Sequence, residues 1–386
     1  MVRTHLDVAS GWPVRPEAAD AYTHALTVAW ADPAGRHAEA RAAQDLLQRA
    51  NETIAHHLVA RPDDVVWTGS GTEAVTLAVW GTARAAVLRG DPRRHLVVSA
   101  VEHSSVLATA DRLAEIDGFE VTTVPVDRAG RVDAERMVAA LRPDTVAVHL
   151  QHANHEVGTM QPTHEVSLAC RERDVLLHVD ACQTVGQLGV TLPQVGADVL
   201  TASGAKFGGV RGTGFLVMGE RARLVPMVEG DDRQRGRRSG AVDVPGVAAT
   251  AVALHVATSR MDAERSHREA LRRRLRDGLV EVVDDVVVHG PLAETHPGIV
   301  AASALFVEGA ALADALDEQG FAVHTGSACS TRSGEPSHVL VAMEALTHGH
   351  VRFSVGGDTP PEAVEDAIAA YGATVRALRE QIGAPS

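Results

Sequence analysis

Val175-Leu-Leu-His-Val-Asp-Ala-Cys-Gln183 is an apolar run that ends in a carboxylate and is followed by small residues. Six similar apolar or β-branched runs flank it, at 65–67, 95–99, 121–124, 145–149, 199–202 and 214–218. Helical patterns lie between several of these runs, at 73–88, 104–116 and 134–141. Apolar strands that alternate with helices build mostly parallel sheets covered by helices on both faces. The sequence therefore predicts an α/β fold around a mostly parallel seven-stranded sheet.

The pattern changes near Pro245. A long helical stretch at 247–279 is followed by short strands at 286–289 and 303–307, a helix at 311–319 and terminal helices over 360–382. We expect residues 15–250 to form a large domain, with residues 1–14 and 251–386 forming a smaller α+β domain. Ligands usually bind at the carboxyl ends of parallel strands and between domains.

Composition narrows the class of protein. The chain has 386 residues and a formal net charge of −14, which argues against direct binding of nucleic acid, although Arg233-Gln-Arg-Gly-Arg-Arg238 is locally basic. No apolar run reaches the ~20 residues that a membrane span needs, and the first residues lack a signal-peptide pattern, so we expect a cytoplasmic protein with no membrane partner. Three scattered cysteines predict neither a disulfide framework nor a metal site.

Two polar features follow predicted strands. Thr68-Gly-Ser-Gly-Thr-Glu73 opens a helix with small residues, which suits a phosphate at a helix N-terminus, or is only a tight turn. Asp180 ends an apolar strand, where a carboxylate needs a cation or several hydrogen-bond donors. A protonated pyridine nitrogen would satisfy this carboxylate, and so would a role as the cap of the next helix.

Two nucleophiles lie in small-residue turns. Lys206, in Thr201-Ala-Ser-Gly-Ala-Lys-Phe-Gly-Gly209, is the only lysine of the chain. Burial there would lower its pKa and favour an amine that reacts with an aldehyde cofactor; a solvated loop lysine is the alternative. Cys329, in Thr325-Gly-Ser-Ala-Cys-Ser330, is either a reactive thiol or inert packing. We assign Cys170, in a predicted helix, to packing.

In this order and spacing, these features resemble the cysteine desulfurases of the NifS/IscS kind over nearly the whole chain. Further matching stretches lie at 102–106, 153–158, 235–240, 326–329, 335–340 and 351–356. The resemblance implies the fold-type I architecture of pyridoxal-phosphate-dependent, class V aminotransferase-like enzymes. It places pyridoxal 5'-phosphate in the large domain and the loop of Cys329 in the small one.

The resemblance also assigns roles to the candidate residues. Lys206 would hold the cofactor through its aldehyde and shuttle protons, Asp180 would pair with the pyridinium nitrogen, and His103 would stack on the ring. Arg352 would bind the substrate carboxylate, with Asn154 beside it. The implied cofactor-binding set is Lys206, Asp180, Gln183, Asn154, Gly71, Thr72, Ser203 and His103.

The implied reaction converts L-cysteine to L-alanine. Its sulfur passes to Cys329 as a persulfide and then to an acceptor protein, and the resemblance implies a homodimer. Supply of sulfur for DNA phosphorothioation is one niche, with tRNA thiolation, Fe–S clusters and natural products open. A selenocysteine lyase, another C–S lyase on the same fold, or a catalytically weak scaffold for a sulfur-transfer partner are the alternatives.

This chain departs from the family pattern at several positions. Ala205 replaces a histidine before the lysine, and Ala241 replaces a threonine after the Arg-Ser-Gly motif. Both family residues contact the phosphate or ring, the second from the neighbouring subunit, so each loss implies roughly 1 kcal/mol of cofactor affinity. The first motif is also altered, to Val8-Ala-Ser-Gly-Trp12. These departures favour a specialised member of the family.

Overall fold

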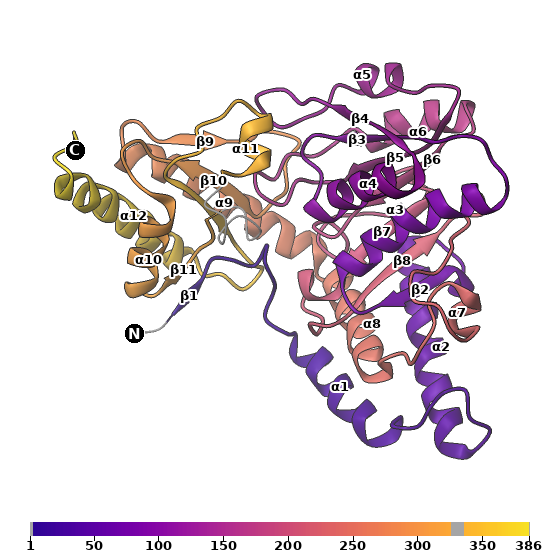
Figure 1. Cartoon of the computed structure of the whole chain (residues 1–386). Coiled ribbons are helices and arrows are strands. Elements are labelled where there is room, and N and C mark those ends of the chain that lie inside the picture. Colours follow the sequence, from indigo (N-terminus) through magenta and orange to yellow (C-terminus); the bar gives the residue numbers. More distant parts are fainter. Residues whose placement is uncertain (1–2, 326–335, 386) are drawn as a thin grey trace.

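A seven-stranded sheet organises the larger part of the molecule (Figure 1). The structure is a computed structural model that describes residues 3–325 and 336–385, so Cys329 lies outside the described residues. The strand order is β2-β8-β7-β6-β5-β3-β4, and β8 alone runs antiparallel to its neighbours in this sheet. The strands are β2 Val65–Thr68, β3 His95–Ser99, β4 Glu120–Val124, β5 Thr145–Gln151, β6 Leu176–Asp180, β7 Val199–Ser203 and β8 Gly214–Met218. The predicted mostly parallel seven-stranded sheet is confirmed.

Helices cover both faces of this sheet because its strands are apolar on both sides. Along β3, Leu96 and Val98 pack with α3 and α4, whereas Val97 belongs to the opposite core with α2, α6 and α8. This period of two follows from the alternation of side chains along a strand. The helices of this part are α1 Pro16–Val28, α2 Ala38–Leu58, α3 Gly71–Leu88, α4 Ser104–Asp117, α5 Ala134–Ala139, α6 Thr163–Glu172, α7 Arg233–Gly236 and α8 Val244–Ser259.

A second, smaller body carries both ends of the chain (Figure 1). Its antiparallel sheet has the order β12-β10-β9, and β1 pairs in parallel with β11. Leu6 joins the apolar core of this body, which α9 and α12 cover. Its elements are β1 Thr4–His5, α9 Met261–Val282, β9 Val287–His289, β10 Ile299–Ser303, α10 Gly309–Glu318, β11 Phe321–Ala322, α11 His338–Ala342, β12 His350–Ser354 and α12 Pro361–Gln381.

We propose the division into 15–250 and 1–14 with 251–386 as the two domains. Leu271 of α9 packs in the second core, which supports this division, whereas Ala257 of α8 packs in the core of the large sheet, so the end of α8 lies with the large domain. Two details differ from the sequence expectations. The single helix expected over 247–279 is two helices joined at Arg260, because its halves pack in different cores. The strand expected at 303–307 is wrong in its position along the sequence, because β10 spans Ile299–Ser303.

The register of the large sheet brings polar side chains to one edge. Gln151, the last residue of β5, lies opposite Asp180 of β6, and Asp180 lies opposite Thr201 of β7. The loops that follow these three strands therefore begin side by side. No helix in the described part of the chain is both long enough and apolar enough to cross a membrane.

Candidate active site

A cavity of about 570 Å³ opens where these loops meet the smaller body. The large domain contributes the carboxyl ends of β5, β6 and β7 and the N-terminus of α3, and the smaller body contributes the segment after β1 and part of β12. The predicted site residues that line it are Gly71, Thr72, His103, Asp180, Gln183, Ser203, Lys206 and Arg352. Eight residues separated by up to 281 positions thus share one cavity.

Lys206 lies just after β7, in a short 3₁₀ turn. Its backbone carbonyl accepts a hydrogen bond from Gln187 Nε2 at 2.8 Å, which fixes the turn, and its Nζ donates to the carbonyl of Ala9. Burial, followed by the positive charge of Arg352, lowers the pKa of Lys206 to about 8. A sizeable fraction of the amine is therefore neutral near neutral pH, which is the form that attacks an aldehyde.

Asp180 and Gln183 face the same cavity from the end of β6. Asp180 is 8% exposed, and its Oδ1 accepts the N–H of Cys182 at 2.9 Å. Gln183 Nε2 donates to Ala9 at 3.0 Å, whereas its buried Oε1 has no hydrogen-bond partner among the described residues. A carboxylate and an orphaned amide oxygen on one wall suit a ligand that brings two donors, such as a pyridinium N–H and a ring hydroxyl.

The N-terminus of α3 forms another part of the cavity wall. Ser70 caps this helix by accepting the N–H of Glu73 at 3.0 Å. The first N–H groups of a helix have no partner within it and attract anions. A Cβ on Gly71 would lie 2.8 Å from Ser203 Cβ, so glycine is required for this close approach. Gly71, Thr72 and Ser203 therefore form a compact wall that suits a phosphate.

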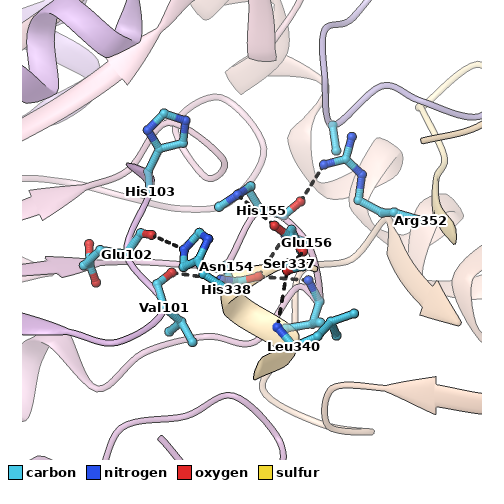
Figure 2. A network of polar contacts seen from close by, with 12 residues as sticks. Val101, Glu102, His103, Asn154, His155, Glu156, Ser337, His338, Leu340 and Arg352 are labelled. Carbon is cyan, nitrogen blue, oxygen red and sulfur yellow. Dashed lines mark hydrogen bonds and ion pairs between the residues drawn. The ribbon is translucent and has the colours of Figure 1, made fainter. Parts of the chain in front are cut away.

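His103 caps the N-terminus of α4. Its Nδ1 accepts the N–H of Ser105 at 3.2 Å and lies 2.7 Å from the Ser105 hydroxyl, so we assign the ring proton to Nε2. Burial lowers the pKa of His103, with the charge of Asp180 opposing this shift. The ring of His103 makes an edge-to-face contact with His155, with centroids 5.4 Å apart (Figure 2).

The side chain of Asn154 joins the turn that follows it to the loop after β3. Its Oδ1 accepts the N–H groups of Glu156 at 2.8 Å and Val157 at 2.9 Å, and its Nδ2 donates to the carbonyl of Val101 at 3.1 Å (Figure 2). Asn154 is fully buried, and it is not among the described residues that line the cavity. In this structure it shapes the turn that presents His155 rather than the cavity surface.

Two buried carboxyl groups lie beside this network. Glu102 accepts hydrogen bonds from Ser99 Oγ at 2.6 Å and from the N–H of Gln151 at 3.0 Å, and burial raises its pKa to about 8. Glu156 accepts a hydrogen bond from Ser337 Oγ at 2.6 Å, and burial raises its pKa as well. Each carboxyl group has one oxygen with no hydrogen-bond partner among the described residues, although Glu156 Oε1 lies 3.6 Å from His155 Nε2. This arrangement fits a protonated acid.

Arg352 crosses the cavity from β12 and is 3% exposed. Its Nη2 donates to Asp7 Oδ1 at 2.6 Å and to Ser10 Oγ at 2.7 Å, and its Nη1 donates to the carbonyl of His155 at 2.9 Å. Figure 2 shows this last contact, with His155 between Arg352 and His103. The guanidinium is thus fixed at the cavity wall by both domains.

Described residues on either side of Cys329 in the sequence line this cavity. His324 and His338 are the nearest of these residues to Cys329 along the chain. Of the other cysteines, Cys182 lines the cavity and Cys170 is buried in a core. Burial raises the pKa of Cys182 well above its ordinary value, helped by Asp180, and raises that of Cys170 to about 12. Both thiols are therefore poor nucleophiles.

Sequence reasoning missed several lining residues. The residues concerned are Asp7, Ser10, His155 and His338, which line the cavity. The last three lie in stretches that the sequence analysis names, without a role for them, and Asp7 lies in none. Ala205 lines the cavity and Ala241 is exposed. The basic run 233–238 is neutralised within the chain by the pairs Arg233–Asp32, Arg235–Asp63, Arg237–Asp64 and Arg238–Glu73.

Comparison with known proteins identifies the class. The model of the aminotransferase class-V family matches residues 4–366, so the chain belongs to this family, whose members depend on pyridoxal 5'-phosphate. More narrowly, the chain is 35% identical over 361 residues to cysteine desulfurase IscS of Dictyoglomus turgidum, covering 93% of this chain and 91% of the relative. It is 37% identical over 382 residues to cysteine desulfurase IscS of Anaeromyxobacter dehalogenans, covering 97% and 93%.

Solved structures agree with this placement. A NifS-like protein superposes with a TM-score of 0.90 at 26% identity, covering 97% of this chain and all of that one. DndA from Streptomyces lividans gives 0.75 at 30% identity, covering 88% and 96%. SspA in complex with cysteine gives 0.78 at 26% identity, covering 91% and 98%. The predicted resemblance and fold type are confirmed.

Proposed function

We propose that this protein is a pyridoxal-phosphate-dependent cysteine desulfurase, which converts L-cysteine to L-alanine and passes the sulfur to Cys329. The family match and the relatives named cysteine desulfurase support this activity, and a similar structure holds cysteine. The observation that carries the proposal is convergence. An amine, a carboxylate and a guanidinium meet in one cavity at Lys206, Asp180 and Arg352. The same cavity is lined by His324 and His338, which lie on either side of Cys329 in the sequence.

The residues present fit the cofactor. Lys206 would hold its aldehyde, Asp180 its ring nitrogen, and Gly71, Thr72 and Ser203 its phosphate. The Oε1 atom of Gln183, which has no hydrogen-bond partner among the described residues, would accept a hydrogen bond from the ring hydroxyl. When bound, pyridoxal phosphate acts as an electron sink that stabilises negative charge on the substrate carbon.

The side chains of this cavity divide the remaining work. Arg352 binds the substrate carboxylate, because a guanidinium matches a carboxylate with two parallel hydrogen bonds. Lys206 takes and returns protons at the substrate carbon, a role that suits a pKa of about 8. His103, whose Nδ1 is held by Ser105 and whose proton we assign to Nε2, would stack on the cofactor ring and relay protons.

The sulfur step uses the thiolate of Cys329. This thiolate attacks the sulfur of the bound cysteine, an S–S bond forms, and the C–S bond breaks with its electron pair moving to carbon. That carbon takes a proton and becomes the methyl group of alanine, and the enzyme retains a persulfide. The raised pKa values of Cys182 and Cys170 leave Cys329 as the thiol suited to this attack.

The partners of this reaction are a protein acceptor and a second copy of the chain. A net charge of −14 favours a protein rather than a nucleic acid as the acceptor of sulfur. A cytoplasmic location, without a membrane partner, is part of the proposal. Dimerisation is supported by an apolar strip on and after α1, where Leu26 is 51% and Trp30 is 70% exposed. Light scattering that gives the mass of one chain would contradict the dimer.

Intact-mass spectrometry tests the proposed function. After incubation of the cofactor-loaded protein with L-cysteine, we expect a gain of one sulfur atom on the peptide that carries Cys329, together with L-alanine in solution. Cys329→Ser abolishes the gain, whereas the matched variant Cys182→Ser retains it. Release of alanine without any sulfur on the protein would refute the transfer to Cys329 and indicate a lyase.

A further inference from the structure

The hydrogen-bond donors of Arg352 are already committed to the protein. A guanidinium has five N–H groups, two on each Nη and one on Nε. Both hydrogens of Nη2 are used, by Asp7 Oδ1 at 2.6 Å and Ser10 Oγ at 2.7 Å. One hydrogen of Nη1 goes to the carbonyl of His155 at 2.9 Å, and Nε is buried without a partner in the described structure.

This count conflicts with simultaneous binding of a substrate carboxylate. A carboxylate is held bidentately either by Nη1 with Nη2 or by Nε with Nη2. Both arrangements need a hydrogen of Nη2. As Arg352 stands, a ligand can therefore reach only one hydrogen of Nη1, unless Asp7 or Ser10 leaves.

The competing carboxylate is fixed by the backbone around it. Asp7 forms a parallel bridge with Ser354 at the end of β12, and the N–H of Ala9 donates to Ser354 Oγ at 2.9 Å. Ser10 Oγ donates to Asp7 Oδ1 at 2.8 Å, so the hydroxyl and the carboxylate act as one unit. Asp7 also lines the cavity and is part of its wall.

We propose that Asp7 is a built-in competitor for the substrate carboxylate, which must displace Asp7 from Arg352 before it is held by two hydrogen bonds. This inference rests on the proposed function, in which Arg352 binds cysteine. Displacement lowers the affinity for every carboxylate ligand. An amino acid overcomes this cost because its amine also engages the cavity, whereas a simple carboxylate such as acetate does not. Asp7 therefore helps to select α-amino acids.

Calorimetric binding of L-alanine to the cofactor-loaded protein tests this proposal, because alanine has the carboxylate and amine of the substrate but no sulfur. We expect Asp7→Asn to bind L-alanine about tenfold more tightly than the wild type. Asp285→Asn is the matched control: Asp285 pairs with Arg379, which is also 3% exposed but lies outside the cavity. This control should leave the affinity for alanine unchanged, as should the use of L-alaninamide, which lacks the carboxylate, with Asp7→Asn.

Each outcome of these binding measurements either supports or overturns the proposal about Asp7. Equal or weaker binding of alanine by folded Asp7→Asn would overturn the proposal and make Asp7 a positioning residue for Arg352. If Asp7→Asn does not fold, Ser10→Ala serves, because it releases one hydrogen of Nη2 and keeps the charge; about threefold tighter binding supports the proposal, and no gain overturns it. Arg352→Gln separates this inference from the proposed function: if it binds alanine as the wild type does, Arg352 is not the carboxylate site and both fail.

Discussion

Replacing Glu102 by glutamine should make the protein more stable at neutral pH. Glu102 is fully buried, and burial raises its pKa from the ordinary 4.5 to about 8. The folded protein therefore keeps this group protonated between these values, while the unfolded chain releases the proton. The contribution of Glu102 to the free energy of unfolding is fully present below pH 4.5 and falls by about 1.4 kcal/mol per pH unit up to about pH 8. The loss amounts to roughly 3 kcal/mol at pH 7. Glutamine is neutral in both states and removes this loss.

Urea unfolding of wild type and Glu102→Gln from pH 5.5 to 8 measures the effect. The difference in unfolding free energy should widen with pH at about 1.4 kcal/mol per unit. Glu156 has a raised pKa too, but both proteins retain it, so the difference isolates Glu102. Glu115→Gln, on the exposed face of α4, should give a curve parallel to the wild type. Parallel curves for Glu102→Gln as well would refute the reasoning and show that the buried carboxyl group is ionised.

Three further predictions concern the cavity. Uptake of pyridoxal phosphate by cofactor-free protein should accelerate as pH rises through about 8, because the neutral amine of Lys206 is the nucleophile; absorbance follows this uptake, and a rate independent of pH would contradict it. Reduction of the loaded protein with borohydride should label one peptide, since Lys206 is the only lysine, and label elsewhere would exclude this assignment. Gly71→Ala should weaken cofactor binding by about 1–3 kcal/mol in equilibrium titrations, because its Cβ would lie 2.8 Å from Ser203 Cβ; unchanged affinity would remove Gly71 from the phosphate wall.

Much of the large domain is readable from the sequence because its strands are buried on both faces. Each predicted run, such as 145–149, falls on a strand of the sheet, and strand ends predict where Asp180 and Lys206 meet. The smaller body is less readable, since its apolar stretches are short. Ile299–Ser303 and 303–307 are similarly apolar, and only tertiary packing selects the first. Likewise, the helical pattern over 247–279 does not indicate that one helix ends and another begins at Arg260.

The motifs of the candidate site could be recognised in the sequence, whereas the contacts that hold its side chains in place could not. Lys206 and Asp180 were singled out from residue type and from their position after a strand, and Arg352 from the family resemblance. The contact between Arg352 and Asp7 spans 345 positions, and no local pattern indicates it. The same holds for Asn154, whose expected place beside the ring and the substrate stays a prediction, since in the structure its side chain closes a turn.

The first strand has a consequence for how the protein matures on the ribosome. Thr4 pairs with Phe321, and Ala9 accepts hydrogen bonds from Gln183 and Lys206 while its N–H donates to Ser354. Residues 4–9 thus dock only after residues more than 300 positions later in the chain have been translated. The entropic cost of closing a loop grows slowly with loop length, so closing this long loop costs little more than closing a shorter one. A nascent chain therefore has no complete cavity until β12 has emerged, because β12 supplies Arg352 and the serine that holds Ala9.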